Sequence, residues 1–149
     1  IEAFWEIDRI EFVAPEHEKY AHADVPFPIG FGQTISQPMT VAIMLELLEP
    51  QRGQKILDVG SGSGWTTALL SYIVGEKGKV IGMERKKELM DFGRKNVDKF
   101  SYVKKGIAQF VHGDGSKGYE AEAPYDRILV SAMADCVPNE LKEQVRSAD

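Results

Sequence analysis

Short apolar segments alternate with longer helical segments from Lys55 onward. Apolar runs of strand length, each bounded by Gly, Asp or Pro, predict strands at 55–59, 79–83, 108–111 and 127–131. The stretches between and after them predict helices at about 65–74, 86–100 and 138–145. Strands and helices that alternate in this way build a parallel sheet with helical crossovers. We therefore predict an α/β fold with a doubly wound, mostly parallel sheet, which binds ligands at the carboxyl ends of its strands.

The segment before this pattern shows no such alternation of strands and helices. Residues 1–37 mix acids with aromatics, and Pro26, Pro28, Gly30 and Gly32 punctuate the chain against both helix and strand. We expect a long irregular lead-in there. A helical apolar repeat follows, at Val41, Met44, Leu45 and Leu48. It predicts an amphipathic helix that starts at Pro38, with Ser36 or Gln37 as its N-cap.

Size and charge limit the classes of function. The 149 residues, 43% of them apolar, fit one domain over residues 1–149. A net charge of −5 leaves no excess of positive charge for phosphates, so we expect no nucleic-acid partner. The apolar runs are far shorter than the ~20 residues of a membrane span, so we expect no membrane partner. The single cysteine, Cys136, cannot form an internal disulfide, which fits a cytoplasmic protein.

The most informative motif follows the first predicted strand, whose end carries Asp58. Glycines alternate with serines before the next helix, at Gly60, Ser61, Gly62, Ser63 and Gly64. Such a loop lets backbone approach a ligand and presents free N–H groups to an anion. The alternative is a tight turn with incidental glycines. A dinucleotide fingerprint would need Gly at position 65, which is Trp, and the lysine of a phosphate-binding loop is missing.

Two acids follow the next predicted strands. Glu84 comes 24 residues after Gly60, where a carboxylate accepts hydrogen bonds from ribose hydroxyls. Asp114 lies between Gly113 and Gly115, where it could accept the amine of adenine. A solvated acid at Glu84 and an Asx turn at Asp114 remain the alternatives.

Other chemistries lack their residues. His17, His22, His112 and Cys136 show no spacing typical of metal ligands, so we expect no metal. Ser131 closes the fourth predicted strand without the acid and base partners of a nucleophilic triad. Covalent catalysis is therefore not indicated.

The glycine loop resembles motif I of the S-adenosylmethionine-dependent methyltransferases. Upstream, the stretch Gly32-Gln33-Thr34-Ile35-Ser36-Gln37-Pro38 closely resembles the hallmark of the protein-L-isoaspartate O-methyltransferase family. The resemblance runs from about residue 12 to 145. Asp135 departs from it, because the family usually carries Pro there. The family also has a helical segment before residue 1 and further strands after residue 145, so both ends look truncated.

The resemblance implies a Rossmann-like methyltransferase fold. Residues 1–37 would form the substrate side, and residues 38–149 the cofactor-binding core without its C-terminal strands. The cofactor would be S-adenosyl-L-methionine, with S-adenosyl-L-homocysteine as product. Glu84 would hold the ribose, and Asp114 with Gly115 the adenine. The methionine part would contact Asp58, Gly60, Ser61, Gly62, Ser63, Gly64 and Ser131.

The implied substrates are damaged peptides and proteins that carry an L-isoaspartyl residue, whose α-carboxyl group is methylated. Ser36 and Thr34 would orient this carboxylate, and Gln33, Gln37 and Ala132 would border it. Ser36 could instead serve only as a helix cap. The functional alternatives are another methyl acceptor and a cofactor-binding remnant without catalysis. We expect a monomer, or weak self-association through the exposed last strand.

Overall fold

A four-stranded parallel sheet lies at the centre of the computed structural model, which describes residues 1–147. The strand order is β5-β4-β3-β6, and the strands are β3 (Lys55–Val59), β4 (Lys79–Glu84), β5 (Ala108–His112) and β6 (Arg127–Val130). The order runs outward from β3 through β4 to β5 and then reverses to β6 on the other side of β3. The predicted α/β class and the existence of all four strands are confirmed, with strand ends shifted by at most one residue.

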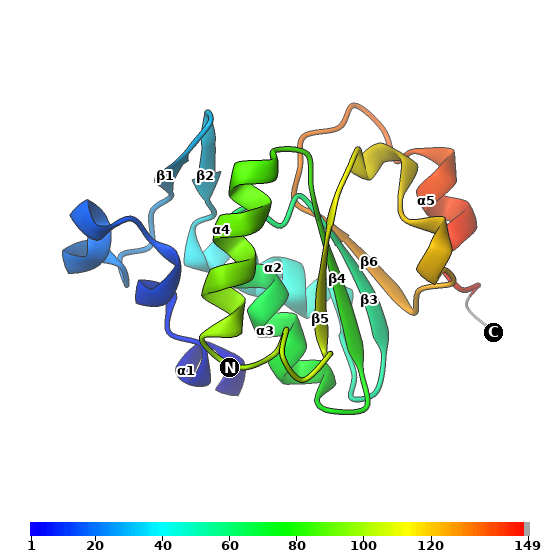
Figure 1. The fold of residues 1–149 in the computed structure, drawn as a ribbon, viewed down its shortest axis with the longest axis horizontal. Helices are drawn as coiled ribbons and strands as arrows, with labels where there is room; N and C mark the ends of the chain where they lie inside the picture. The colour runs from blue at the N-terminus through cyan, green and yellow to red at the C-terminus, as the bar shows by residue number, and fades with distance from the viewer. Residues whose placement is uncertain (148–149) are drawn as a thin grey trace.

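Helices cover both faces of this sheet (Figure 1). One face carries α2 (Pro38–Leu48), α3 (Trp65–Val74) and α4 (Lys87–Asp98), and the other carries α5 (Asn139–Gln144) with the 3-10 turns η3 (Gly115–Lys117) and η4 (Glu120–Glu122). The four predicted helices are confirmed. Two of them are shorter than expected, because α4 ends before Phe100 and α5 ends before Val145.

The expectation of an irregular lead-in over residues 1–37 was wrong. The segment holds α1 (Glu2–Glu6), the 3-10 helices η1 (Arg9–Phe12) and η2 (Pro15–Tyr20), and a hairpin of β1 (Phe27–Gly30) and β2 (Gln33–Ile35). Proline is tolerated in this two-stranded sheet because each strand has a free edge. The turn residues Phe31 and Gly32 both have positive φ, at 56° and 71°, as a tight type I′ hairpin turn requires.

The N-terminus of α2 is capped from outside its own sequence neighbourhood. Gln37 occupies the N-cap position, but its side chain makes no capping hydrogen bond. Instead, the Met39 N–H donates to Asp24 Oδ1 at 2.8 Å, and Gln37 Nε2 donates to Asp24 Oδ2 at 3.1 Å. These hydrogen bonds, the one from Met39 first, hold the pKa of Asp24 below its usual range. The predicted N-cap position is therefore confirmed at Gln37, but the capping hydrogen bond comes from Asp24, and the Ser36 hydroxyl is left available.

Alternation along β3 divides the core into two clusters. Ile56 packs with the cluster on the face of α3, whereas Leu57 and Val59 pack with the cluster on the face of α5. Asp58 has the same parity as Ile56, and its side chain therefore points toward α3. A carboxylate is thus placed inside the layer between the sheet and its helices.

A close contact between two glycines fixes α4 against the loop that follows β3. A Cβ atom added to Gly64 would lie 2.7 Å from the Gly93 carbonyl oxygen, and one added to Gly93 would lie 2.7 Å from the Gly62 carbonyl oxygen. Gly64 also has φ of 88°, a conformation that side chains disfavour. This packing explains why position 93, inside α4, holds glycine although glycine disfavours helix.

We predict that Gly93→Ala destabilises the protein although alanine favours helix. Helix propensity alone would add up to about 1 kcal/mol of stability, whereas overpacking against the loop costs typically about 1–3 kcal/mol. Urea unfolding of the variant checks the sign. Arg94→Ala, on the exposed side of the same helix, is the control and should change stability little. A Gly93→Ala protein more stable than the parent would contradict the packing argument.

Candidate functional site

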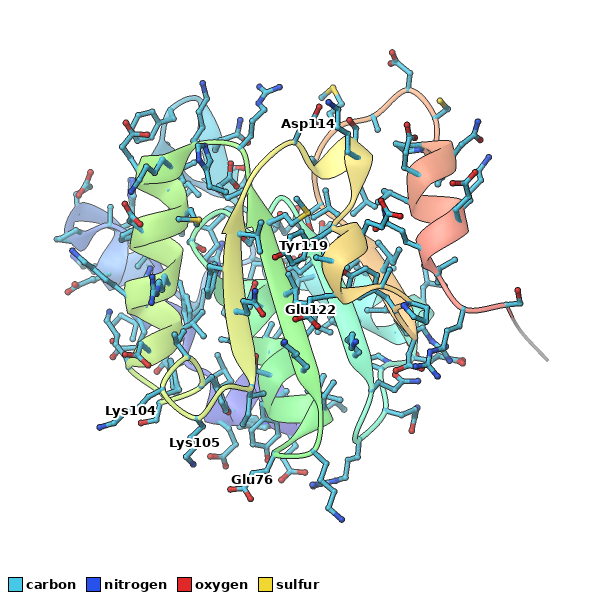
Figure 2. All side chains as sticks on the ribbon, turned by 45° about the vertical axis from the view of Figure 1, so that its right-hand side comes forward. Glu76, Lys104, Lys105, Asp114, Tyr119 and Glu122 are labelled. Atoms are coloured by element: carbon cyan, nitrogen blue, oxygen red, sulfur yellow. The ribbon has the colours of Figure 1, made fainter. Side chains whose placement is uncertain are left out.

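A cavity of about 920 Å³ opens at the carboxyl edge of the sheet. Every parallel strand contributes to its wall through the residues at or after its end, and the β1–β2 hairpin also contributes to it. Figure 2 shows Asp114 at this edge, whereas Tyr119 and Glu122 lie lower over the face of the sheet. The predicted site residues on its wall are Gln33, Thr34, Ser36, Gly60, Gly62, Glu84, Asp114, Gly115, Ser131 and Ala132.

The glycine loop is held mainly by its own protein contacts. The N–H groups of Gly60 and Ser61 both donate to the Met83 carbonyl oxygen at 2.9 Å, and Gly64 N–H donates to the Ser61 carbonyl oxygen at 2.8 Å. Gly62 N–H donates to Glu84. For Gly60, Ser61, Gly62 and Gly64 the expectation of free N–H groups is therefore wrong, because β4 and the loop itself provide their acceptors. The loop is therefore preorganised before any ligand arrives.

Glu84 is a buried acid at the end of β4, with 8% of its surface exposed. Its Oε2 accepts from Gly62 N–H at 3.0 Å, and its Oε1 accepts from the N–H groups of Arg85 and Lys86 at 2.9 and 3.1 Å. The alternative of a solvated acid is therefore wrong. A carboxylate offers about four acceptor positions, so three internal bonds leave roughly one for a ligand in the cavity.

Asp114 forms the Asx turn that was its alternative interpretation. Its Oδ1 accepts from Ser116 N–H at 3.0 Å and from Ser116 Oγ at 2.7 Å, which starts η3. These bonds, the hydroxyl first, hold the pKa of Asp114 below its usual range, so the exposed group is ionised at neutral pH. Gly115 has a packing reason of its own, since a Cβ there would lie 2.3 Å from Val59 Cγ1. The adenine role of Asp114 stays a prediction.

The reversal of strand order lies between β3 and β6, and both strand ends reach the cavity there. Ser131 N–H donates to the Val59 carbonyl oxygen at 2.9 Å. A Cβ added to Gly60 would lie 3.1 Å from Ala132 N, so the two chain segments touch. Ligand sites in doubly wound sheets occur at this switch point. Ser131 and Ala132 thus border the cavity where the sequence placed them.

The polar strip from Gln33 to Gln37 is only partly at the cavity. Gln33, Thr34 and Ser36 line it, whereas Gln37 lies outside it and binds Asp24. Within residues 1–147, the Ser36 hydroxyl makes no hydrogen bond to protein, while its carbonyl oxygen accepts from Arg9 at 3.0 Å. Ser36 is therefore held through its backbone with its hydroxyl available to a ligand.

A smaller cavity of about 30 Å³, the scale of one or two water molecules, joins this strip to the glycine loop. Its wall includes Ser36, Ser61, Ser63 and Trp65. Ser61 Oγ and Trp65 Nε1 are both buried without a hydrogen-bond partner in the described part of the chain. Buried donors normally have hydrogen-bond partners. The Ser61 hydroxyl and the Trp65 indole N–H can therefore still bond to a ligand or a water molecule at this junction. The sequence pattern indicates for Trp65 only that it breaks a dinucleotide fingerprint, so its part in this junction is a finding of the structure.

Asp58 does not reach either cavity. The side chain is fully buried, and its Oδ2 accepts from the hydroxyls of Thr66 and Thr67, both at 2.7 Å. Burial raises the pKa of Asp58 to about 6, the two hydroxyls oppose that rise, and the nearby Glu84 charge adds to it. Asp58 therefore anchors the start of α3 below the loop. Gly64 likewise packs against α4 and lines neither cavity.

Several contributors were not found from the sequence. Arg85, Lys86 and Met133 line the cavity, and Gly93 and Asp24 hold its walls from behind. A glycine inside a helical pattern was the one available signal for Gly93. In residues 1–147, no three His, Cys, Asp or Glu side chains are grouped to hold a metal ion, and no helix has the length and apolar character of a membrane span.

Comparison with known proteins agrees with this architecture. Residues 1–148 match the family model described as protein-L-isoaspartate(D-aspartate) O-methyltransferase. Proteins named protein-L-isoaspartate O-methyltransferase from Thermococcus onnurineus and Methanopyrus kandleri are 50% and 49% identical over 145 residues. Those matches cover 97% of this chain but 64% and 63% of the relatives. The chain therefore spans less than two thirds of their length.

Solved structures give the same result. A structure named protein-L-isoaspartate O-methyltransferase is 32% identical, with a TM-score of 0.84, and the match covers 97% of this chain and 46% of that one. A Plasmodium falciparum structure with the same enzyme name, in complex with S-adenosyl-L-homocysteine, is 27% identical, with a TM-score of 0.86 and coverages of 97% and 70%. The fold is that of the Rossmann-like methyltransferases. The chain belongs to the protein-L-isoaspartate(D-aspartate) O-methyltransferase family.

We predict that Asp58 makes the protein less stable as pH rises through about 4 to 6. The folded state keeps the Asp58 proton to higher pH than the unfolded chain does, so stability falls across this window. Relative to the parent, Asp58→Asn should therefore gain about 2 kcal/mol between pH 4.5 and pH 7. Urea unfolding of both proteins at the two pH values measures the difference. A pH-independent difference would mean that Asp58 is ionised at an ordinary pKa.

Proposed function

We propose that this chain binds S-adenosyl-L-methionine and transfers its methyl group to the α-carboxyl group of L-isoaspartyl residues in damaged peptides and proteins. The observation that carries the proposal is the meeting of two groups of residues in one cavity. Thr34 and Ser36 of the hallmark stretch line the same cavity as Gly60, Gly62 and Glu84. Family membership and the S-adenosyl-L-homocysteine in a similar structure support the choice of cofactor.

The residues present fit such a cofactor. A volume of about 920 Å³ is at the upper end of the range for ligand pockets. Gly60 and Gly62 put side-chain-free backbone on its wall, and Glu84 retains acceptor capacity beside them. On this proposal, the loop holds the methionine part, with Ser61, Ser63 and Ser131 near it. Glu84 holds the ribose, and Asp114 with Gly115 holds the adenine.

The chemistry asks little of acid and base groups. When bound, the cofactor supplies an electrophilic methyl group on a cationic sulfur. A peptide α-carboxyl group has a pKa of about 3.3 to 3.7, so the nucleophile is already ionised at neutral pH. The protein needs no general base for this step, and no His of residues 1–147 lines the cavity. Its task is to orient the carboxylate and to exclude water.

Thr34 and Ser36 are the groups proposed to orient the carboxylate. Both carry hydroxyl donors, both line the two cavities, and the hydroxyl of Ser36 is unused by the protein. Gln33 and Ala132 lie on the same wall and would border the peptide. Gln37 would act less directly, since its side chain binds Asp24.

Two further properties belong to the proposal. The single cysteine, Cys136, is exposed and free, which supports a reducing, cytoplasmic location. Among residues 1–147, β6 pairs with β3 on one edge and with no strand on the other, which supports weak self-association. The alternatives of another methyl acceptor, or of cofactor binding without catalysis, are decided by the two experiments below.

We predict that an isoaspartyl peptide is methylated at least about 10²-fold faster than its aspartyl twin. The α-carboxylate of the isoaspartyl form lies one methylene closer to the backbone than the aspartyl side-chain carboxylate does. Misplacing a nucleophile by about 1 Å costs ~10²-fold in rate. Transfer of radioactive methyl groups to the two peptides gives the ratio. Equal rates would point to another acceptor, and binding of the cofactor without transfer would point to a remnant.

Ser36→Ala should lower methyl transfer by at least tenfold while cofactor affinity changes little. The hydroxyl contacts the acceptor in the proposed site and not the cofactor, so its loss acts on the transition state. Steady-state kinetics and calorimetry with S-adenosyl-L-homocysteine measure the two quantities. Thr40→Ala, at an exposed position of α2 that lines neither cavity, is the matched control. An equal loss of cofactor affinity would return Ser36 to a purely structural role.

A further inference from the structure

Arg9 is a buried arginine that no part of the proposed function uses. It lies in η1 with 3% of its surface exposed and lines neither cavity. No carboxylate in residues 1–147 is within ion-pair distance of it, and burial lowers the pKa of Arg9. A buried charge without a carboxylate partner is unfavourable unless other groups compensate. A residue of this kind therefore needs a structural or functional reason.

The compensation comes from four backbone carbonyl groups. Arg9 Nη1 donates to Ala21 and Ala23 at 2.8 and 3.3 Å, and Arg9 Nη2 donates to Val25 and Ser36 at 2.8 and 3.0 Å. The first three acceptors alternate along one short segment, residues 21–25. The fourth belongs to the residue proposed to bind the methyl acceptor. One guanidinium thus joins the lead-in segment to the hallmark stretch.

Two aromatic rings hold the guanidinium from its sides. Arg9 Cζ lies 5.3 Å from the centroid of Phe27 and 5.3 Å from the centroid of Trp65. Phe27 begins β1, and Trp65 is the first residue of α3, directly after the glycine loop. Cation–π contacts of this kind reinforce the geometry. From outside the cavity, Arg9 therefore contacts both the polar strip, through Ser36, and Trp65, the residue directly after the glycine loop.

Asp24 completes the arrangement around Ser36. It lies in the middle of the segment that Arg9 holds, and it binds Met39 N–H and Gln37 Nε2 at the start of α2. Ser36 is consequently fixed on one side by Arg9 through its carbonyl group and on the other by Asp24 through the next helix. Its hydroxyl carries neither restraint.

We propose that Arg9 is a positioning residue for the methyl acceptor, whose guanidinium sets the place of Ser36 relative to the glycine loop. This inference rests on the proposed function and adds a residue to it. Lysine keeps the charge at this position but has no planar fork, so it cannot bind the same carbonyl groups in the same plane. Arg9→Lys should therefore weaken the positioning of residues 33–37 while keeping a positive charge at position 9.

The test compares the 149-residue chain with Arg9→Lys, Arg9→Met and a matched control, Lys99→Met. Lys99 donates to the Glu11 carbonyl oxygen at 3.0 Å and pairs with the Glu11 carboxylate at 3.1 Å, so it anchors the same 3-10 helix without touching the strip. Hydrogen exchange at residues 33–37 reports positioning directly. We expect exchange there at least tenfold faster in both Arg9 variants and unchanged in Lys99→Met, with β5 as the internal reference.

Kinetics below the unfolding temperature give the second readout. Arg9→Lys should lower kcat/KM for the isoaspartyl peptide by about 10²-fold, while affinity for S-adenosyl-L-homocysteine stays within threefold. Unchanged exchange at residues 33–37 in both Arg9 variants would overturn the inference, and so would a loss of cofactor affinity as large as the loss of kcat/KM. Absence of methyl transfer by the parent protein would reject the proposed function, while the exchange result would still decide the positioning role of Arg9.

Discussion

The site depends on the attachment of the glycine loop to the end of β4. Two N–H groups of the loop share the Met83 carbonyl oxygen, and a third donates to the buried carboxylate of Glu84. Because Glu84 also accepts from the first two N–H groups after β4, one side chain sets both turns at the carboxyl edge. The close packing of Gly64 on Gly93 then leaves the loop no room to shift toward α4. A ligand therefore meets a wall that is already formed.

Three polar side chains that do not line the cavity hold its wall in place. Asp58 anchors α3 through two threonine hydroxyls, and the unfavourable burial of its charge is visible in its raised pKa. Asp24 caps α2, which frees the Ser36 hydroxyl from that role. Arg9 fixes the Ser36 carbonyl group while its guanidinium lies over Trp65. Asp58, Asp24 and Arg9 thus act on placement from outside the cavity, while the cavity wall carries hydroxyls and backbone together with the charged side chains of Glu84, Arg85, Lys86 and Asp114.

The glycines also have a different explanation from the one that their spacing favours. Positions 60, 62 and 64 each face protein atoms at the place of a missing Cβ: Ala132, Ile29 and Gly93 respectively. Ligand approach and internal packing are compatible, since Gly60 and Gly62 also line the cavity. Packing thus requires glycine most strictly at position 64, while at positions 60 and 62 tight contacts add to a positive φ that favours glycine.

Local sequence determined the strands, most helix boundaries and the identity of the motif residues, because hydrophobic periodicity and turn chemistry act within a few residues. It also placed Gly60, Glu84, Asp114 and Ser131 at successive strand ends, which meet at one edge in any parallel sheet. The β1–β2 hairpin at residues 27–35 is a local feature that the sequence reading missed, whereas only the tertiary structure decided that Asp24 and not Ser36 caps α2, and that Asp58 and Gln37 stay outside the cavity. It also brought Arg9 to Ser36 across 27 positions. Those outcomes depend on contacts between distant segments, which no local pattern contains.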